Sequence, residues 1–295
     1  MWHLSVAKES ILIADYIFKC KKSLKTDKEV FELWEKDFKF LTKIIRKYEF
    51  GAVVIDYENR LYLLFIDKSG FPLMCGYTTV GVTYLLSSIN NFGVNYDLIT
   101  KAGKVSGLIE KENKNFISVK MPFAEVLSKK IDVNCRIATR ADIAKCGNSF
   151  VLCRTNNLIE HTIKEIKNYS ANIKSKYPVD GVLWYSILSS NENRIKTRSI
   201  TIFGEENQVY LSPCGTGSSS LAILFKNEKF KNNFVLESYS LSGNKFCIKF
   251  PTKSNSPTLY LSDSIIAEYN ENSNSFYAKN TNWSVVKMKE YFINV

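Results

Sequence analysis

One pattern occurs twice in this chain, and it constrains the fold more than any other feature. Residues 60–89 read RLYLLFIDKSGFPLMCGYTTVGVTYLLSSI, and residues 198–225 read RSITIFGEENQVYLSPCGTGSSSLAILF. Each segment starts with an arginine and a β-rich run, passes a polar turn, makes a second extended stretch and reaches Cys-Gly before an apolar helix. A repeat of this size predicts two similar halves, each contributing one cysteine, Cys75 and Cys214.

The position of these two cysteines predicts a chemical role for their thiols. Each lies where glycine and small residues begin a helix, and the first backbone N–H groups of a helix have no acceptor within it. Those donors and the helix dipole favour negative charge, so we expect the pKa of each thiol to fall from about 8.5 towards ~3.5–7.5. Two such helix starts facing each other would hold a carboxylate between two ionisable thiols. That arrangement suits removing a proton from one face of a carbon and returning one to the other.

The remaining cysteines and the histidines give little further chemistry. Buried cysteines usually act as small hydrophobic residues, and we assign that role to Cys20, Cys135, Cys153 and Cys247. The count of seven is odd and no C-x-x-C pair occurs, which argues against a disulfide framework. Only two histidines are present and no Cys/His cluster exists, so the sequence predicts no metal site.

Length and composition exclude several classes of protein. A chain of 295 residues with 45% hydrophobic and 23% charged residues fits one large domain or two ordinary ones. No apolar run is long enough to span a membrane, and the N-terminus lacks the features of a signal peptide, so we expect a cytoplasmic protein. The net charge of +11 comes from scattered lysines beside acidic residues or asparagines, which predicts no nucleic-acid partner.

The two cysteine motifs resemble the active-site motifs of the proline racemase family, within the diaminopimelate-epimerase-like superfamily. The motifs are MCGYTTVG at residues 74–81 and SPCGTGSSS at residues 212–220. Between residues 45 and 250 other segments are similar to the family in the same order. They are ISVKMPF (117–123), ADIAKCGNSFVLC (141–153) and ESYSLSGNKFCIKF (237–250).

The resemblance implies an α+β fold of two pseudo-symmetric lobes, each a curled, mostly antiparallel sheet around a central helix, with the site between them. We expect an N-terminal lobe over residues 1–133 that carries Cys75 and is completed by about residues 270–295. The C-terminal lobe would span residues 134–269 and carry Cys214. The sequence also predicts strands at 10–18 and 50–66, a loop at 190–194, and a hairpin or loop at 269–283.

Residues 27–48 are typical of an amphipathic helix. The apolar face would comprise Val30, Leu33, Trp34, Phe38, Leu41, Ile44, Ile45 and Tyr48, with Asp37 interrupting it.

The family resemblance also implies a function. It implies an isomerase that racemises or epimerises an amino acid at the α-carbon without pyridoxal phosphate or any other cofactor. By position, Cys75 and Cys214 would be the two acid–base residues. Gly76, Gly215, Thr216 and Gly217 would supply backbone donors to the substrate carboxylate, which stabilises the charge that develops as the α-proton leaves. The partner would be a small amino acid or a derivative, and because family members are often dimers, the resemblance favours a homodimer.

Two departures from the family pattern alter the expected specificity. Tyr77 stands where the family has His after Cys-Gly, and Tyr210 stands where it has Asp four residues before the second cysteine. The substrate would then lose the negative partner of its ammonium group, which favours a different amino acid or a neutral nitrogen over proline. Asp142 is an alternative acid or a structural residue, and Lys145 and Cys146 replace the family's Tyr-Gly. Lys145 would either favour an acidic substrate or lie exposed at a strand edge.

Two other functions stay open. Some family members eliminate water from a hydroxyproline, but in those members threonine replaces the second cysteine, whereas Cys214 is present here. Alternatively, loss of both substrate-orienting residues would suit a non-catalytic member that binds a small amino-acid-like carboxylate.

Overall fold

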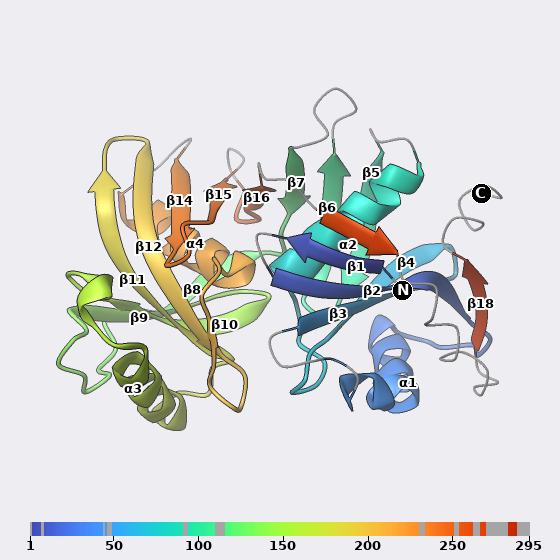
Figure 1. The fold of residues 1–295 in the computed structure, drawn as a ribbon, viewed down its shortest axis with the longest axis horizontal. Coiled ribbons are helices and arrows are strands. Elements are labelled where there is room, and N and C mark those ends of the chain that lie inside the picture. The colour runs from blue at the N-terminus through green and yellow to red at the C-terminus, as the bar shows by residue number, and fades with distance from the viewer. Residues whose placement is uncertain are drawn as a thin grey trace. The chain divides into compact units, whose positions relative to one another are not determined.

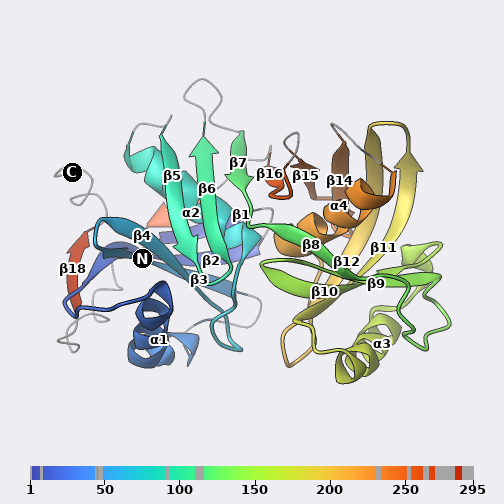
Figure 2. The same cartoon turned by 180° about the vertical axis from the view of Figure 1, so that it is seen from behind.

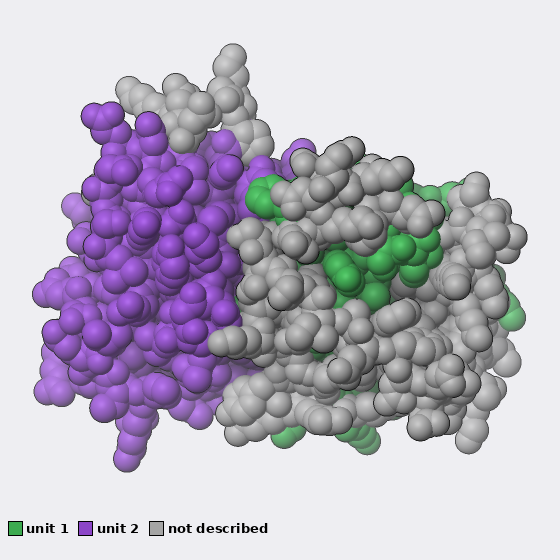
Figure 3. Space-filling view, turned by 45° about the horizontal axis from the view of Figure 1, so that its top comes forward, with its two compact units in different colours: residues 1–119, 262–295 green, residues 120–261 purple. Residues whose placement is uncertain are grey.

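The computed structural model describes residues 2–6, 9–43, 45, 49–90, 94–109, 116–229, 234–250, 254–261, 266–269 and 283–287. They form two compact units, which Figure 3 colours separately. Unit 1 comprises residues 1–119 and 262–295, and unit 2 comprises residues 120–261.

Unit 1 consists of strands with one α-helix on each side of their sheet. Its elements are β1 (Trp2–Val6), β2 (Glu9–Cys20), α1 (Asp27–Phe38), a 3-10 turn (Lys39–Lys43), β3 (Glu49–Tyr57), β4 (Arg60–Ile66), α2 (Gly76–Ile89), β5 (Asn95–Thr100), β6 (Gly103–Ile109), β7 (Ile117–Lys120), β17 (Ile266–Tyr269) and β18 (Trp283–Lys287). Both cartoon views place α1 and α2 on opposite sides of β2, β3 and β4 (Figures 1 and 2). Strand alternation explains this arrangement, since Val53 and Ile55 of β3 share a core cluster with Trp34 of α1. Gly81 of α2 lies instead against Ile11 and Ile13 of β2.

Unit 2 has the same plan. Its elements are β8 (Ala124–Ser128), β9 (Arg140–Cys146), β10 (Asn148–Arg154), a 3-10 turn (Leu158–Glu160), α3 (Ile163–Lys176), β11 (Gly181–Ser190), β12 (Arg194–Phe203), β13 (Gln208–Tyr210), α4 (Gly215–Lys229), β14 (Val235–Ser240), β15 (Lys245–Lys249) and β16 (Thr258–Leu261). Trp184 of β11 is fully buried under α3, and its indole N–H donates to Ser170 Oγ at 2.8 Å. The other helix, α4, packs against β8, β9, β10, β14 and β15.

The strand pairings repeat between the two units. In unit 1, β1 and β2 are antiparallel, β2 and β3 are parallel across α1, β3 and β4 are antiparallel, β4 and β5 are parallel across α2, and β5 and β6 are antiparallel. In unit 2, the same relations join β9 to β10, β10 to β11 across α3, β11 to β12, β12 to β14 across α4, and β14 to β15. The predicted α+β class with two similar, mostly antiparallel halves is therefore confirmed.

Turn residues explain where the hairpins reverse. Glu58 and Asn59 join β3 to β4 with φ values of 52° and 59°, the left-handed conformation that a two-residue hairpin turn requires. The predicted strand run at 50–66 is thus two strands. The loop predicted at 190–194 is present between β11 and β12, where Asn191 Oδ1 accepts the N–H groups of Asn193 and Arg194. Most of the segment predicted as a late hairpin or loop, 269–283, lies outside the described residues.

The helix predicted over residues 27–48 is shorter than expected. Thr26 caps α1 by accepting the Glu29 N–H at 3.2 Å, and α1 ends at Phe38, before the 3-10 turn. The apolar residues beyond Phe38 are less well covered, because Phe40 is 40% exposed and Leu41 is only partly buried. Of the predicted face, Val30, Trp34, Phe38 and Ile45 are buried and Leu33 is partly buried, while Ile44 and Tyr48 lie outside the described residues.

Close packing of α2 on β6 generates a stability prediction. A Cβ atom added at Gly107 would lie 2.7 Å from Thr83 Cγ2 and 2.8 Å from Thr83 Cβ. Thr83 is fully buried, so the helix would have to shift. We expect Gly107→Ala to lower the free energy of unfolding by about 1–3 kcal/mol. Urea unfolding combined with hydrogen exchange of the α2 and β6 amides measures this change.

The neighbouring substitution Ser106→Ala is the control, because the Ser106 side chain bonds to the exposed Asp97 carboxylate rather than to the helix. It should change stability by less than about 0.5 kcal/mol. Equal effects of the two substitutions would contradict the packing argument.

Candidate active site

Cys75 is the residue on which α2 begins. Its backbone is extended (φ −135°, ψ 114°), and its carbonyl accepts the Thr79 N–H at 3.0 Å, as the first acceptor of the helix. The Thr78 hydroxyl donates to Cys75 Sγ at 3.0 Å. The residue is 7% exposed. The first turn of α2 therefore supplies a donor directly to this sulfur.

Cys214 occupies the equivalent place before α4. Its carbonyl accepts the Ser218 N–H at 2.8 Å, which repeats the bond from Thr79 to Cys75. Its sulfur accepts the Gly217 N–H at 3.3 Å and lies 3.4 Å from Thr216 Oγ1. The equivalence predicted from the repeat holds for the backbone, and each sulfur lies beside a threonine hydroxyl, although that threonine is the third residue after Cys75 and the second after Cys214.

A second layer of contacts orients the Thr216 hydroxyl. Asn148, at the start of β10, donates from Nδ2 to Thr216 Oγ1 at 3.5 Å, and both residues are about 2% exposed. Because the Thr216 oxygen accepts this bond, its own proton is available to the sulfur of Cys214.

The pKa of Cys214 corrects one expectation from the sequence. Burial raises the pKa of this thiol above its ordinary value, although the Thr216 hydroxyl, the Gly217 and Thr216 N–H groups and the Thr201 hydroxyl oppose that effect. The expected lowering is therefore wrong for Cys214, because loss of hydration outweighs the donors of one helix turn. In this environment Cys214 is a thiol at neutral pH.

The two tyrosines that depart from the family pattern are both buried. Tyr77 is 4% exposed, and its ring stacks on Phe50 at a centroid distance of 6.3 Å. Tyr210 is 7% exposed, and its hydroxyl donates to Gln208 Oε1 at 2.8 Å. Since that bond uses the phenolic proton, the Tyr210 oxygen keeps acceptor capacity.

Glycines begin both helices and allow close packing there. Gly76 and Gly215 are the first residues of α2 and α4, and both are buried. A Cβ atom at Gly217 would lie 2.8 Å from Leu183 Cδ1 and 3.3 Å from Cys214 Sγ. Only glycine at position 217 leaves the N–H close to the sulfur without displacing Leu183.

The residues that replace the family's Tyr-Gly segment have structural contacts. Lys145 forms a 2.8 Å ion pair with Glu125 on the neighbouring strand, and both side chains are partly exposed. Cys146 is fully buried and donates to the Pro122 carbonyl at 3.4 Å, and burial raises the pKa of its thiol. Ser219 opposes this rise in the pKa of Cys146, and Cys214 adds to it.

Asp142 is held by structural partners. Its carboxylate accepts two bonds from Arg140, at 2.6 and 2.8 Å, and the Lys130 N–H at 3.0 Å. Arg140 also binds Glu228 in the last part of α4. These contacts support the structural alternative for Asp142.

The described contacts divide the predicted site residues between the two units. Unit 1 holds Cys75, Gly76 and Tyr77, and unit 2 holds Tyr210, Cys214, Gly215, Thr216 and Gly217. Sequence reasoning missed Thr78, Asn148, Thr201 and Gln208, which contact these residues. Of these, only Thr78 could have been predicted from the sequence, because it lies one helical turn after Cys75.

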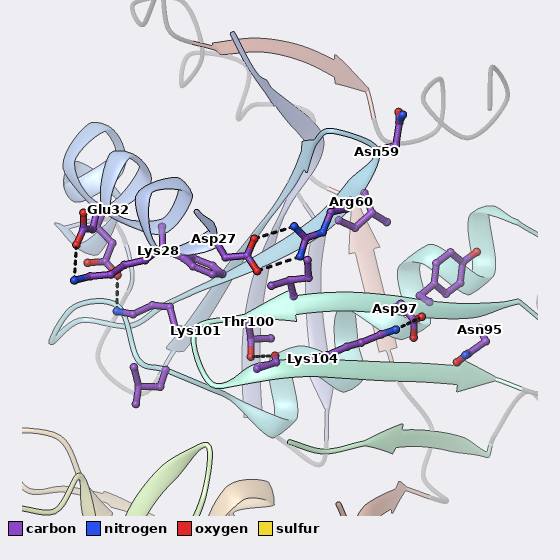
Figure 4. Close-up of a pocket in the computed structure, with 17 residues that line it drawn as sticks. Asp27, Lys28, Glu32, Asn59, Arg60, Asn95, Asp97, Thr100, Lys101 and Lys104 are labelled. Atoms are coloured by element: carbon purple, nitrogen blue, oxygen red, sulfur yellow. Dashed lines mark hydrogen bonds and ion pairs between the residues drawn. The ribbon is translucent and has the colours of Figure 1, made fainter. Parts of the chain in front are cut away.

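A separate hollow of about 1070 Å³ lies in unit 1, between α1 and the β5–β6 hairpin (Figure 4). Its charged lining residues pair with one another: Asp27 with Arg60, Lys28 with Glu32, Glu35 with Lys101, and Asp97 with Lys104. None of the predicted site residues is among its described lining residues. Because these charges are already compensated, the hollow has no evident preference for a charged ligand.

Two features are absent from the described part of the chain. No group of three or more His, Cys, Asp or Glu side chains is placed to hold a metal ion there. None of the described helices is both long and apolar enough to cross a membrane.

Comparisons with known proteins place these features in a family. The family model described as "Proline racemase" matches residues 52–260, which include both cysteine motifs. A curated relative, the 4-hydroxyproline 2-epimerase of Acinetobacter baumannii (strain AYE), is 22% identical over 202 residues. That match covers 64% of this chain and 64% of the relative, slightly less than two thirds of its length.

Solved structures share the fold at low sequence identity. A hydroxyproline epimerase from Agrobacterium vitis, with bound trans-4-OH-L-proline, is 15% identical with a TM-score of 0.64 and 90% coverage of both chains. A probable proline racemase from Agrobacterium radiobacter K84, with bound carbonate, is 13% identical with a TM-score of 0.63, covering 92% of this chain and 93% of the other. These similarities confirm the predicted fold.

The raised pKa of Cys214 generates a pH prediction. A thiol whose pKa is raised stays protonated to higher pH, and only the thiolate reacts with iodoacetamide. We expect the alkylation rate at Cys214, followed by peptide mass spectrometry, to rise with pH through a midpoint above that of an ordinary cysteine. A midpoint near or below pH 7 would show that the helix start, not burial, controls this thiol.

Proposed function

The chain belongs to the proline racemase family, and we propose that it is a cofactor-independent racemase or epimerase that inverts the α-carbon of an amino acid or a derivative. Racemases and epimerases are isomerases. The observation that carries this proposal is the pair of Cys-Gly helix starts, Cys75 on α2 and Cys214 on α4, inside the matched region. Fold similarity alone would not carry it, because one fold supports many activities.

The proposed reaction is a pair of proton transfers. One cysteine, as thiolate, takes the α-proton from one face of the substrate, and the other, as thiol, gives its proton to the opposite face. The substrate returns to its original composition with inverted configuration, and the two cysteines exchange protonation states. The reverse direction uses them in opposite roles.

Backbone donors stabilise the intermediate state of the reaction. As the α-proton leaves, negative charge moves onto the substrate carboxylate, and N–H groups aimed at that carboxylate stabilise it. The first turns of α2 and α4, at Gly76, Gly215 and Thr216, are the proposed source of these donors. The Gly217 N–H already donates to Cys214, which supports a role for it in holding the sulfur.

Tyr77 and Tyr210 form the proposed basis of an altered specificity. Neither carries a negative charge at neutral pH, so neither compensates a buried ammonium group. The Tyr210 hydroxyl, which donates a hydrogen bond to Gln208, is neutral, so any bond that it accepts from a substrate N–H would be to an uncharged oxygen. A neutral nitrogen, as in an acylated amino acid, or a primary amine with another partner, fits this acceptor better than the cyclic ammonium of proline.

The proposal also includes the setting of the reaction. All seven cysteines are described and none forms a disulfide, which is compatible with the reducing cytoplasm that we propose as the site of action. We further propose a homodimer with a small-molecule substrate as its only required partner.

Solvent exchange tests the two-cysteine reaction. In heavy water the wild-type protein should introduce deuterium at the substrate α-carbon, detected by mass spectrometry across a panel of free, N-acylated and peptide-linked amino acids. We expect Cys75→Ser and Cys214→Ser to lose at least about a hundredfold of this rate, since a serine hydroxyl is a far weaker acid and base. Cys247→Ser, which changes a partly buried cysteine of β15, should retain it.

Two results would argue against the proposal. No exchange with any member of the panel, combined with ligand binding that is insensitive to alkylation, would indicate a non-catalytic binding protein. A cyclic imine product from hydroxyproline would indicate dehydration instead.

A second experiment tests the altered specificity. The double substitution Tyr77→His and Tyr210→Asp restores the family's two polar residues, so it should raise exchange with proline or 4-hydroxyproline at least about tenfold relative to the best wild-type substrate. The readout is the ratio of kcat/KM values for the two substrates. Wild-type protein that already turns over hydroxyproline as its best substrate would rule out a changed specificity.

A further inference from the structure

The inner face of β12 is lined by hydroxyl groups. Ile200 and Ile202 pack with α3, so the alternating residues Thr197, Ser199 and Thr201 point to the opposite face of the sheet. All three are at most 1% exposed. Ser199 Oγ lies 3.1 Å from Ser238 Oγ, but the hydroxyls of Thr197 and Thr201 have no hydrogen-bond partner among the described residues.

Thr201 lies beside two of the predicted site residues of unit 2, Tyr210 and Cys214. It is the partner of Tyr210 in the β12–β13 pair and of Leu183 in the β11–β12 pair. Leu183 packs at Gly217, where a Cβ atom would lie 2.8 Å from Leu183 Cδ1 and 3.3 Å from Cys214 Sγ, so Thr201 lies beside the start of α4. A buried hydroxyl without a firm partner is uncommon, because its lost hydration is not replaced. The Cys214 sulfur, when it carries negative charge as a thiolate, would accept a hydrogen bond from this hydroxyl.

The repeat shows that the fold itself does not need this hydroxyl. When the two segments are aligned on Arg60 and Arg198, Leu63 stands at the position of Thr201, on the same side of its own strand. Leu63 is fully buried. An apolar side chain therefore suits this position of the fold, and the hydroxyl in unit 2 requires another explanation.

We propose that Thr201 is a positioning residue for Cys214: its buried hydroxyl donates a hydrogen bond to the thiolate form and holds that sulfur for proton transfer. This inference rests on the proposed function. Thr201 then adds to the donors of α4, which include the Gly217 N–H at 3.3 Å and the Thr216 hydroxyl at 3.4 Å. The donors come from two directions, because Thr201 belongs to the sheet and the others belong to α4.

Other ionisable groups on the elements around α4 also bear on the pKa of the Cys214 thiol. Titratable groups on neighbouring elements include the Cys146 thiol of β9, which interacts with Cys214, and the Tyr210 phenol of β13. Several charged groups on the elements around α4 pair with one another: Glu125 with Lys145, Asp142 and Glu228 with Arg140, and Glu237 with Arg194, Lys196 and Lys245. A hydroxyl donor at position 201 is therefore expected to have a measurable effect.

The test compares isosteric variants of two threonines on the same strand. Thr201→Val removes the hydroxyl and keeps the shape of the side chain, whereas Thr201→Ser keeps a hydroxyl. Thr197→Val removes an equally buried hydroxyl on the same face of β12, four residues earlier. Alkylation of Cys214 by iodoacetamide is measured against pH by peptide mass spectrometry in the full chain, with Cys75 followed in the same samples.

We expect Thr201→Val to move the Cys214 midpoint upwards by about one pH unit, the size of one hydrogen bond to a charged group. Thr201→Ser should restore the wild-type midpoint, and Thr197→Val should leave it unchanged. In the exchange assay, Thr201→Val should lower kcat about tenfold near neutral pH without changing KM, and the loss should shrink as pH rises.

An unchanged midpoint in Thr201→Val, or an equal shift in Thr197→Val, would overturn the inference. The two proposals fail separately. Wild-type protein that exchanges no α-proton would refute the proposed function, whereas the titration of Cys214 decides without any substrate whether Thr201 binds the thiolate.

Discussion

The proposed function depends on the competition between burial and hydrogen bonding at Cys214. Burial favours the neutral thiol, while the donors of α4 and β12 favour the thiolate. A sulfur in this balance can be returned to either protonation state, which a residue that alternately accepts and donates a proton requires. The surrounding architecture serves this balance: Gly217 brings its N–H to the sulfur, and Asn148 fixes the direction of the Thr216 hydroxyl.

The two units use one plan with different interior chemistry. On the inner face of β4, Leu63 and Phe65 are fully buried apolar side chains. At the corresponding positions of β12, Thr201 takes the place of Leu63, whereas Phe203 matches Phe65. The framework that positions each cysteine is thus shared, while the polarity around each helix start is set by a few side chains on one strand. Such separation of framework from local polarity gives two halves of similar fold different surroundings for their cysteines.

The sequence was most informative where the signal was local or repeated. The double Cys-Gly motif predicted the paired halves and the family, and the loop after Ser190 was predicted from its composition. The prediction was weaker where tertiary packing decides: α1 ends at Phe38 because its apolar face is not covered further on. Thr201 could not be found from the sequence, because its relation to Cys214 depends on the register of β12 with β13. The predicted lowering of the Cys214 pKa was wrong for a similar reason, since the burial of a thiol is a property of the assembled fold.

The pairing of β17 with β1 and of β18 with β2 has a consequence for biogenesis. Unit 2 is continuous in sequence, whereas unit 1 needs strands that follow unit 2. During synthesis the first unit to emerge from the ribosome therefore has its edges open while the second is made. The later unit can close first, and the earlier one must hold its unpaired strand edges against association until the last strands arrive.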